Sequence, residues 1–303
     1  MYDVIVIGAG PAGLTSAIYL RRANLSVLVL EANSYGGQII NTVDIENYPG
    51  LEHISGFDLA TKMYEQAKDL GCEFKYQRVE EIIDNKDIKE VITNKEKFSA
   101  KAIIIATGNK SRLLGLDNED KYLGRGISYC ATCDGNFYKN KDVAVVGGGN
   151  TALEDALYLS HIVNKLYLIH RRDEFRGDPK TIELLKNRNN IEYVLNSNIT
   201  KINGSDRLES IEVTNKDGSV KELNVSGLFI AIGRVPENSN FKDLINLDDN
   251  GYVISNDRCT TNVEGIFVAG DARVKEVRQL TTAVGDGAIS ATEAIKYINK
   301  KEI

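Results

Sequence analysis

Short, continuous apolar runs rich in Val and Ile recur along this chain, and several of them lead through a glycine-rich turn into an amphipathic segment. Continuous runs of this length are typical of strands in a parallel sheet, which are buried on both faces. Amphipathic segments between such strands are typical of the helices that cover the sheet. The pattern therefore predicts an α/β fold.

One strand–turn–helix–strand pattern occurs twice. In the first copy, a strand at residues 2–7 leads into the turn Gly8–Gly13, and the second strand ends at Glu31. In the second copy, a strand at residues 142–146 leads into the turn 147–152, and the second strand ends at His170. Both copies place 23 positions between the first glycine and the end of the second strand. A single glycine-rich turn is a weak signal, but two copies with equal spacing favour two dinucleotide sites.

The glycine-rich turns have a physical reason. The first glycine permits a tight turn, the second lets the backbone approach a pyrophosphate, and the third position must be small so that helix and strand pack closely. The start of the helix then offers unpaired N–H groups and a partial positive charge to the phosphates. We expect the binding residues to be Gly8, Gly10, Pro11, Ala12 and Gly13 at the first site and Gly147, Gly149, Asn150 and Thr151 at the second.

Three later apolar runs set the expected domain boundaries. Those at residues 102–108 and 227–233 follow the first and second copies, whereas the run at residues 265–271 has no glycine-rich turn of its own. Returning this third run to the first domain predicts two Rossmann-like dinucleotide-binding domains, the second inserted in the first. The expected FAD-binding domain comprises residues 1–113 and 243–303, the NADPH-binding domain comprises residues 114–242, and residues 300–303 are expected to fray.

The end of each second strand predicts which nucleotide binds. Glu31 can accept hydrogen bonds from an unphosphorylated ribose and would repel a 2′-phosphate, which fits FAD or NAD. The second copy ends in a group of cationic or chargeable donors that suits a phosphate dianion: His170, Arg171, Arg172 and Arg176. Elsewhere these residues would indicate a solvated basic patch, but at this position they predict a preference for NADPH over NADH.

The chemical centre is the pair Cys130 and Cys133, the only closely spaced cysteines among four. Two cysteines separated by two residues can close a small disulfide ring, and one thiol of such a pair commonly has a lowered pKa. A zinc site would need two further ligands, and Cys72 and Cys259 are isolated. Asp134 can donate and accept the proton that thiol–disulfide exchange requires, which favours a redox pair over two buried structural thiols.

Charge and hydropathy argue against several other classes. The net charge is −6 and both signs are interspersed, so a broad nucleic-acid surface is not expected. No apolar run approaches the length of a membrane span, and the N-terminus begins as a strand without a basic leader, which predicts a cytoplasmic protein. His53 and His161 have no visible partners, and no set of side chains has metal-ligand spacing, so no metal is predicted.

Together the motifs resemble low-molecular-weight bacterial thioredoxin reductases over essentially the whole chain. The matching segments are residues 8–13, 36–38, 46–50, 130–135, 147–154, 170–176, 270–271 and 278–279. The resemblance implies that FAD is contacted by Gly36, Gly37, Gln38, Asn47, Thr107, Gly108, Gly270, Asp271, Arg278, Gln279 and Leu280. It places Ile232 and Gly233 with the residues of the nicotinamide-nucleotide site.

The resemblance also implies a reaction path and a partner. Electrons would pass from NADPH through FAD to the disulfide, with Cys133 facing the flavin, Cys130 attacking the partner and Asp134 as the acid–base residue. The partner would be thioredoxin or a thioredoxin-like protein. The family is a homodimer whose inner domain rotates to bring NADPH and the dithiol to the flavin in turn.

Two departures from the family lie near the expected NADPH site. Arg234 stands where many relatives have His, with Glu237 where they have Asn, and Gly177-Asp178-Pro179 stands where relatives often continue a helix with alanine. The alternatives are a reductase that takes electrons from a ferredoxin-type donor, a ferredoxin or flavodoxin reductase, a dithiol oxidase or peroxide-system reductase, and a redox sensor that only holds dinucleotides. The redox pair and the two complete nucleotide motifs favour the disulfide reductase.

Overall fold

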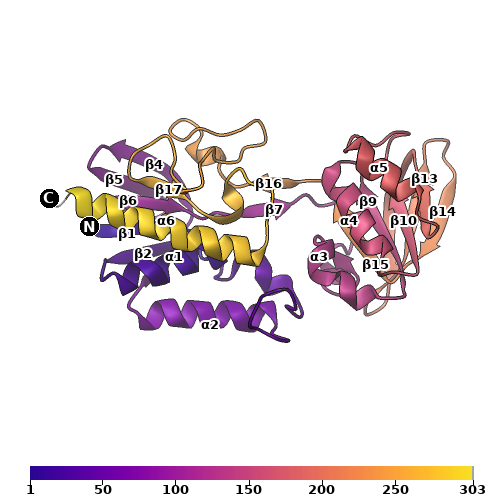
Figure 1. Cartoon of the computed structure of the whole chain (residues 1–303), viewed down its shortest axis with the longest axis horizontal. Coiled ribbons are helices and arrows are strands. Elements are labelled where there is room, and N and C mark those ends of the chain that lie inside the picture. The colour runs from indigo at the N-terminus through magenta and orange to yellow at the C-terminus, as the bar shows by residue number, and fades with distance from the viewer. Residues whose placement is uncertain (302–303) are drawn as a thin grey trace. The chain divides into compact units, whose positions relative to one another are not determined.

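The computed structural model describes residues 1–301, which divide into two compact units (Figure 1). Unit 1 contains Met1–Lys110 and the chain from Val235 onward, and unit 2 contains Ser111–Arg234. Unit 2 is therefore inserted in the sequence of unit 1. Where the chain passes between the units, β7 (Asn109–Ser111) and β16 (Arg234–Pro236) pair as a two-stranded sheet.

The boundaries of unit 2 differ from those expected. They lie after Lys110 and after Arg234, whereas the sequence suggested residues 113 and 242. The larger difference has a clear cause, because Asn238 and Phe241 are buried in unit 1. The Asn238 amide donates to the carbonyl oxygens of Gly251 (3.0 Å) and Ala272 (2.8 Å). Hydrogen bonds from the buried Asn238 side chain to backbone carbonyls fix this stretch in unit 1.

Unit 1 is built on a seven-stranded sheet of order β3-β2-β1-β6-β5-β4, with β17 also paired to β6. Strands β3, β2, β1, β6 and β17 run parallel, and β4 and β5 form an antiparallel hairpin on β6. The expected return of the third apolar run to the first sheet is thus correct, since β17 lies on β6. The strands are β1 (Tyr2–Ile7), β2 (Val27–Glu31), β3 (Glu73–Tyr76), β4 (Val79–Asn85), β5 (Ile88–Thr93), β6 (Lys97–Ile105) and β17 (Ile266–Val268).

The parallel strands are apolar on both faces because both faces are covered. Val4 and Val6 of β1 pack in a core with the helices, whereas Ile5 and Ile7 pack on the opposite face with residues of the segment 241–272. This alternation follows from the two-residue period of a strand. Helices α1 (Pro11–Arg22), α2 (Gly56–Asp69) and α6 (Leu280–Lys301) contribute to the first core, and α1 and α6 lie side by side (Figure 1). The short 3₁₀ helices of unit 1 are η1 (Gly37–Asn41), η4 (Ser239–Phe241) and η5 (Gly270–Ala272).

Unit 2 repeats this design with a parallel sheet of order β11-β10-β9-β15-β8. One face packs against α4 and α5, and the other packs against the antiparallel sheet β12-β13-β14. The strands are β8 (Ile127–Ser128), β9 (Asp142–Gly147), β10 (Lys165–Ile169), β11 (Ile191–Val194), β12 (Ser197–Gly204), β13 (Leu208–Asn215), β14 (Val220–Asn224) and β15 (Gly227–Ala231). The helices are η2 (Asp120–Tyr122), α3 (Ala131–Asp134), η3 (Gly135–Tyr138), α4 (Asn150–Ser160) and α5 (Pro179–Lys186).

Helix α6 continues further than expected. It includes Lys300 and Lys301, so fraying from residue 300 is wrong for these two residues, and residues 302–303 lie outside the described part of the chain. Among the helices of residues 1–301, none combines the length and the apolar character needed to cross a membrane.

Candidate functional site

The first glycine-rich turn connects β1 to α1 and is closed to larger side chains. Gly8 has φ +106°, and a Cβ there would lie 2.3 Å from the carbonyl oxygen of Ala106, which directly follows the neighbouring strand β6. A Cβ at Gly13 would lie 2.0 Å from the carbonyl oxygen of Gly8. Helix α1 begins at Pro11 without a side-chain cap, so its first N–H groups are left for a ligand. This geometry fits a pyrophosphate at the start of α1.

Further expected residues lie around this turn. A Cβ on Gly37 would come within 3.2 Å of the Gly10 Cα, so the two backbones are in close contact. The Gly36 N–H donates to the carbonyl oxygen of Ala9 at 2.8 Å. Glu31, at the end of β2, accepts the Ala9 N–H at 2.8 Å through Oε2. The structure therefore brings the Glu31 carboxylate and the Gly36-Gly37 loop to the same turn, and Gln38 follows in η1 with an exposed side chain.

The C-terminal part of unit 1 closes the same site. A Cβ on Gly270 would lie 2.8 Å from the Ala12 Cβ, which places η5 against the start of α1. The Asn47 side chain donates to Gln279 Oε1 at 3.3 Å, although the two residues are far apart in sequence. Arg278 lies over the Tyr252 ring at 4.2 Å, and its buried Nε has no hydrogen-bond partner within residues 1–301. A buried donor of this kind indicates a bound polar group, so the residues fit a flavin nucleotide.

Two other expected contacts, Thr107 and Gly108, follow β6 directly. The Thr107 hydroxyl donates to Asn238 Oδ1 at 2.8 Å, and Gly108 has φ +68°. Asp271 lies in η5, and Leu280 is the first residue of α6. These positions are all in unit 1, at the ends of elements that begin or finish beside the first glycine-rich turn.

The second glycine-rich turn has the same construction in unit 2. A Cβ on Gly147 would lie 2.3 Å from the carbonyl oxygen of Ala231, just as one on Gly8 would meet Ala106. Helix α4 begins at Asn150 after Gly149 without a side-chain cap. Ala152, the small third position, is fully buried. The expected residues Thr151, Ile232 and Gly233 lie in the first turn of α4 and directly after β15.

The expected phosphate-binding segment lies at this turn, and its histidine is buried. The Arg176 N–H donates to the carbonyl oxygen of Gly148 at 2.8 Å. His170 is 4% exposed and stacks on Phe175, and burial, followed by Arg176 and Arg171, lowers its pKa. Within residues 1–301, its buried Nε2 has no hydrogen-bond partner, so a role of His170 in binding the nucleotide stays a prediction. The exposed cations of the segment are Arg171, Arg172 and Arg176.

Cys130 and Cys133 form a disulfide with a Cα–Cα distance of 5.3 Å. Cys130 follows β8 and directly precedes α3, which packs against α4. Because β8, β15 and β9 are parallel, the disulfide and the second glycine-rich turn both follow the carboxyl ends of strands in one sheet. Ligand sites of open α/β sheets lie at this edge. The two cysteines thus pair with each other and do not form half of a zinc site.

Asp134 is held beside the pair by a residue that the sequence did not single out. The Ser128 hydroxyl donates to Asp134 Oδ2 at 2.6 Å, and the Cys130 N–H donates to Ser128 Oγ at 3.1 Å. Burial raises the pKa of the Asp134 carboxyl, and the bond from Ser128 partly lowers it again. A half-buried carboxyl with a raised pKa can hold and release a proton closer to neutral pH than an exposed one.

A second carboxyl in unit 2 was also missed. Asp155 lies on α4, one turn after Thr151, and burial raises its pKa to about 7, with Arg234 lowering it and Glu154 raising it. No sequence signal marks this residue, because its burial depends on the packing of α4. Carboxyls titrating near neutral pH cluster at functional sites, although structural positions also produce them.

The remaining cysteines are isolated from the pair. Cys72 and Cys259 are free, buried thiols, and burial raises the pKa of each to about 12. Their thiolates are scarce at neutral pH, so they lack the reactive form of cysteine.

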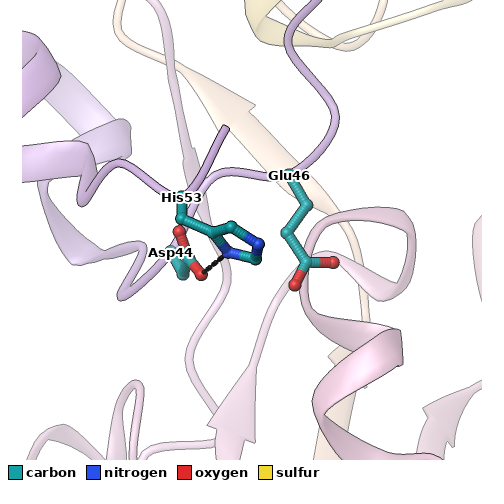
Figure 2. A group of neighbouring side chains, drawn as sticks. All are labelled: Asp44, Glu46 and His53. Atoms are coloured by element: carbon teal, nitrogen blue, oxygen red, sulfur yellow. Dashed lines mark hydrogen bonds and ion pairs between the residues drawn. The ribbon is translucent and has the colours of Figure 1, made fainter. Parts of the chain in front are cut away.

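Both remaining histidines have partners that spacing along the chain does not reveal. His161 Nε2 lies 2.6 Å from Arg188 Nη2, and His53 Nδ1 lies 2.8 Å from Asp44 Oδ2. Figure 2 shows the His53 ring between Asp44 and Glu46. One ring nitrogen of His53 and one carboxylate oxygen of each acidic residue lie within 4.8 Å of one another. The His53 side chain is 75% exposed and its pKa is raised, first by the Asp44 bond. This loop therefore forms a surface ion pair, and we assign no metal to it.

Comparisons with known proteins agree on one family. The model of the pyridine nucleotide-disulphide oxidoreductases matches residues 2–287. Thioredoxin reductase of Listeria monocytogenes is 42% identical over 302 residues, covering 99% of this chain and 95% of that protein, and thioredoxin reductase of Bacillus subtilis is 41% identical over 302 residues, covering 99% and 96%. The crystal structure of thioredoxin reductase from Streptococcus pyogenes is 42% identical and superposes with a TM-score of 0.95 over 99% of each chain.

Proposed function

We propose that this chain, which belongs to the pyridine nucleotide-disulphide oxidoreductases and within them to the low-molecular-weight thioredoxin reductases, reduces thioredoxin or a thioredoxin-like protein with electrons from NADPH. The overall reaction consumes NADPH, one proton and the disulfide of the partner, and it yields NADP⁺ and the dithiol of the partner. The observation that carries the proposal is the Cys130–Cys133 disulfide, beside Asp134, at the sheet edge that also bears the second glycine-rich turn.

The residues of unit 1 would bind FAD, and those of unit 2 would bind NADPH. FAD supplies two-electron transfer between a nicotinamide and a disulfide. The N–H groups at the start of α1 would hold the FAD pyrophosphate, and Glu31 would accept from the ribose. In unit 2, the exposed guanidinium groups of Arg171, Arg172 and Arg176 would bind the 2′-phosphate of NADPH.

The redox pair and Asp134 would carry the exchange with the partner. Attack by the Cys130 thiolate on the partner disulfide forms a mixed disulfide and releases one partner thiolate, which takes a proton. Attack by Cys133 on Cys130 then releases the second partner thiolate and restores the internal disulfide. The Asp134 carboxyl, positioned by Ser128, would hold the proton that the leaving thiolate needs.

An anaerobic titration with NADPH tests this path in the wild type and in Cys133→Ser. The wild type is expected to consume a second equivalent of NADPH, because both the flavin and the disulfide accept electrons, whereas the variant is expected to stop after one. If the flavin stays oxidised with NADPH but is reduced by a ferredoxin-type protein, NADPH is not the electron donor and the ferredoxin-type protein takes its place.

The nucleotide preference is tested separately with Arg172→Ala. Loss of a charge-assisted contact to the 2′-phosphate is expected to raise the KM for NADPH about tenfold and to leave the KM for NADH nearly unchanged. Equal effects on the two nucleotides would contradict the role of Arg172. The homodimer and the cytoplasmic location are also proposals that rest on the family, and sedimentation of the purified protein tests the first.

A further inference from the structure

Tyr129, the residue before the redox pair, is held at two atoms by groups outside the proposed reaction. Its hydroxyl donates to Glu119 Oε1 at 2.8 Å, and its carbonyl oxygen accepts from Arg234 Nη2 at 3.2 Å. Its peptide bond leads directly to Cys130, so both bonds restrain the backbone of the first cysteine.

Glu119 connects Tyr129 to the segment by which the chain arrives in unit 2. This carboxylate is 4% exposed, and it accepts the N–H groups of Leu114 (3.0 Å, Oε1) and Gly115 (2.9 Å, Oε2) in addition to the Tyr129 hydroxyl. Three donors around a buried carboxylate satisfy it and fix its position. Burial, followed by Glu119, raises the pKa of Tyr129, so its hydroxyl remains protonated and remains a donor.

Arg234 connects Tyr129 to the segment by which the chain leaves unit 2. Arg234 is the first residue of β16, and the Gly233 carbonyl before it accepts the Arg112 N–H of the incoming segment at 3.0 Å. This arginine is the departure from the family noted in the sequence, where many relatives have His. The long arginine side chain reaches the Tyr129 carbonyl through one of its several donors.

We propose that Tyr129 is a positioning residue for the redox pair, held by Glu119 and Arg234, and that it couples the backbone of Cys130 to both chain segments that link unit 2 to unit 1. With the disulfide closed, both bonds are in place. The proposal is that they weaken when the ring opens, so that they favour the closed ring. Removing the Tyr129 hydroxyl would let the Cys130 backbone relax and would make the disulfide easier to reduce. The proposal deepens the proposed function, since it concerns the same pair.

The test is the equilibrium constant for forming the Cys130–Cys133 disulfide in Tyr129→Phe. The purified holoprotein is equilibrated in dithiothreitol redox buffers, alkylated and weighed. Loss of one hydrogen bond to a buried carboxylate is expected to lower the constant by about threefold to tenfold. A tenfold change would raise the midpoint potential by about 30 mV. Glu119→Gln should shift it in the same direction, and the double variant should not add to the single ones.

Tyr122→Phe is a matched control. Tyr122 is also buried in unit 2, but its hydroxyl donates to the carbonyl oxygen of Gly204 at 2.6 Å and not to Glu119. It should cost a similar amount of stability and leave the disulfide constant within twofold of the wild type. An unchanged constant in Tyr129→Phe, or an equal shift in Tyr122→Phe, would overturn the proposal. A wild type that cannot reduce thioredoxin with NADPH would refute the proposed function but would leave this comparison intact.

Discussion

Replacement of Asp155 by Asn should change how the stability of the protein depends on pH. Burial raises the pKa of this carboxyl from 3.8 to about 7 in the folded state. Between these values the folded state holds a proton that the unfolded state has lost. Stability from this group is therefore fully present below pH 3.8 and is lost as the pH rises through 7. Asn has the same shape and stays neutral, so the variant should lack this loss.

The size of the effect follows from the pKa difference. Each pH unit in this window changes the free energy of unfolding by about 1.36 kcal/mol. Between pH 5.5 and the folded pKa there are about 1.5 units, so the wild type should lose about 2 kcal/mol relative to Asp155→Asn by pH 8.5. Arg234 already lowers the pKa of Asp155, so an Arg234 variant should enlarge the loss.

Urea unfolding followed by far-UV circular dichroism at pH 5.5, 7.0 and 8.5 measures the difference. Asp206→Asn is the control, because Asp206 is exposed on the turn between β12 and β13 of the same unit. This control should follow the wild type at every pH. A difference between wild type and Asp155→Asn that stays constant to within about 0.5 kcal/mol across this range would refute the burial of an ionisable Asp155.

Two further predictions concern the proposed catalytic and cofactor residues. Asp134→Asn should slow reduction of thioredoxin by about 10²-fold to 10⁴-fold without loss of the flavin. Ser128→Ala should raise the pKa of Asp134 and shift the pH–rate profile to higher pH. Steady-state rates between pH 6 and 9 check both variants, and wild-type rates in Asp134→Asn would contradict the acid–base role. Gly13→Ala should yield protein without FAD, because its Cβ would lie 2.0 Å from the Gly8 carbonyl oxygen. Gly285→Ala is the control and should remain yellow, because the space around its added Cβ is open. The visible spectrum after desalting shows whether each variant has kept its flavin.

Local pattern was enough to predict the elements that surround the glycine-rich turns. The expected bounds of β1 are those observed, because a continuous apolar run and the glycine that ends it are both visible in the sequence. The disulfide pair was predicted for the same reason, since its two residues are neighbours. The boundary expected after residue 242 differs from the one observed after Arg234, because the burial of Asn238 and Phe241 depends on parts of the chain far away in sequence.

The missed residues share one property, which is that their role depends on burial rather than on spacing. Ser128, Glu119 and Asp155 are ordinary residue types at ordinary positions, and only the packed structure gives each of them its partners or its altered pKa. His170 shows the same dependence, because its position predicted a phosphate donor, whereas its burial and the lowering of its pKa appear only in the structure. Motifs therefore located the chemistry, whereas the burial that shifts the pKa of Asp155 and of His170 depends on the packed structure.

The burial of Cys72 and Cys259 gives the chain a simple read-out of its own oxidation state. At neutral pH, an alkylating reagent should label two thiols of the native protein when the Cys130–Cys133 pair is reduced and none when it is oxidised. The other two thiols should not react, because they are buried and their pKa is raised to about 12. The mass of the native, alkylated protein thus changes in a single step of two labels. Redox titrations of the pair can be followed on the intact chain without removing either of the remaining cysteines.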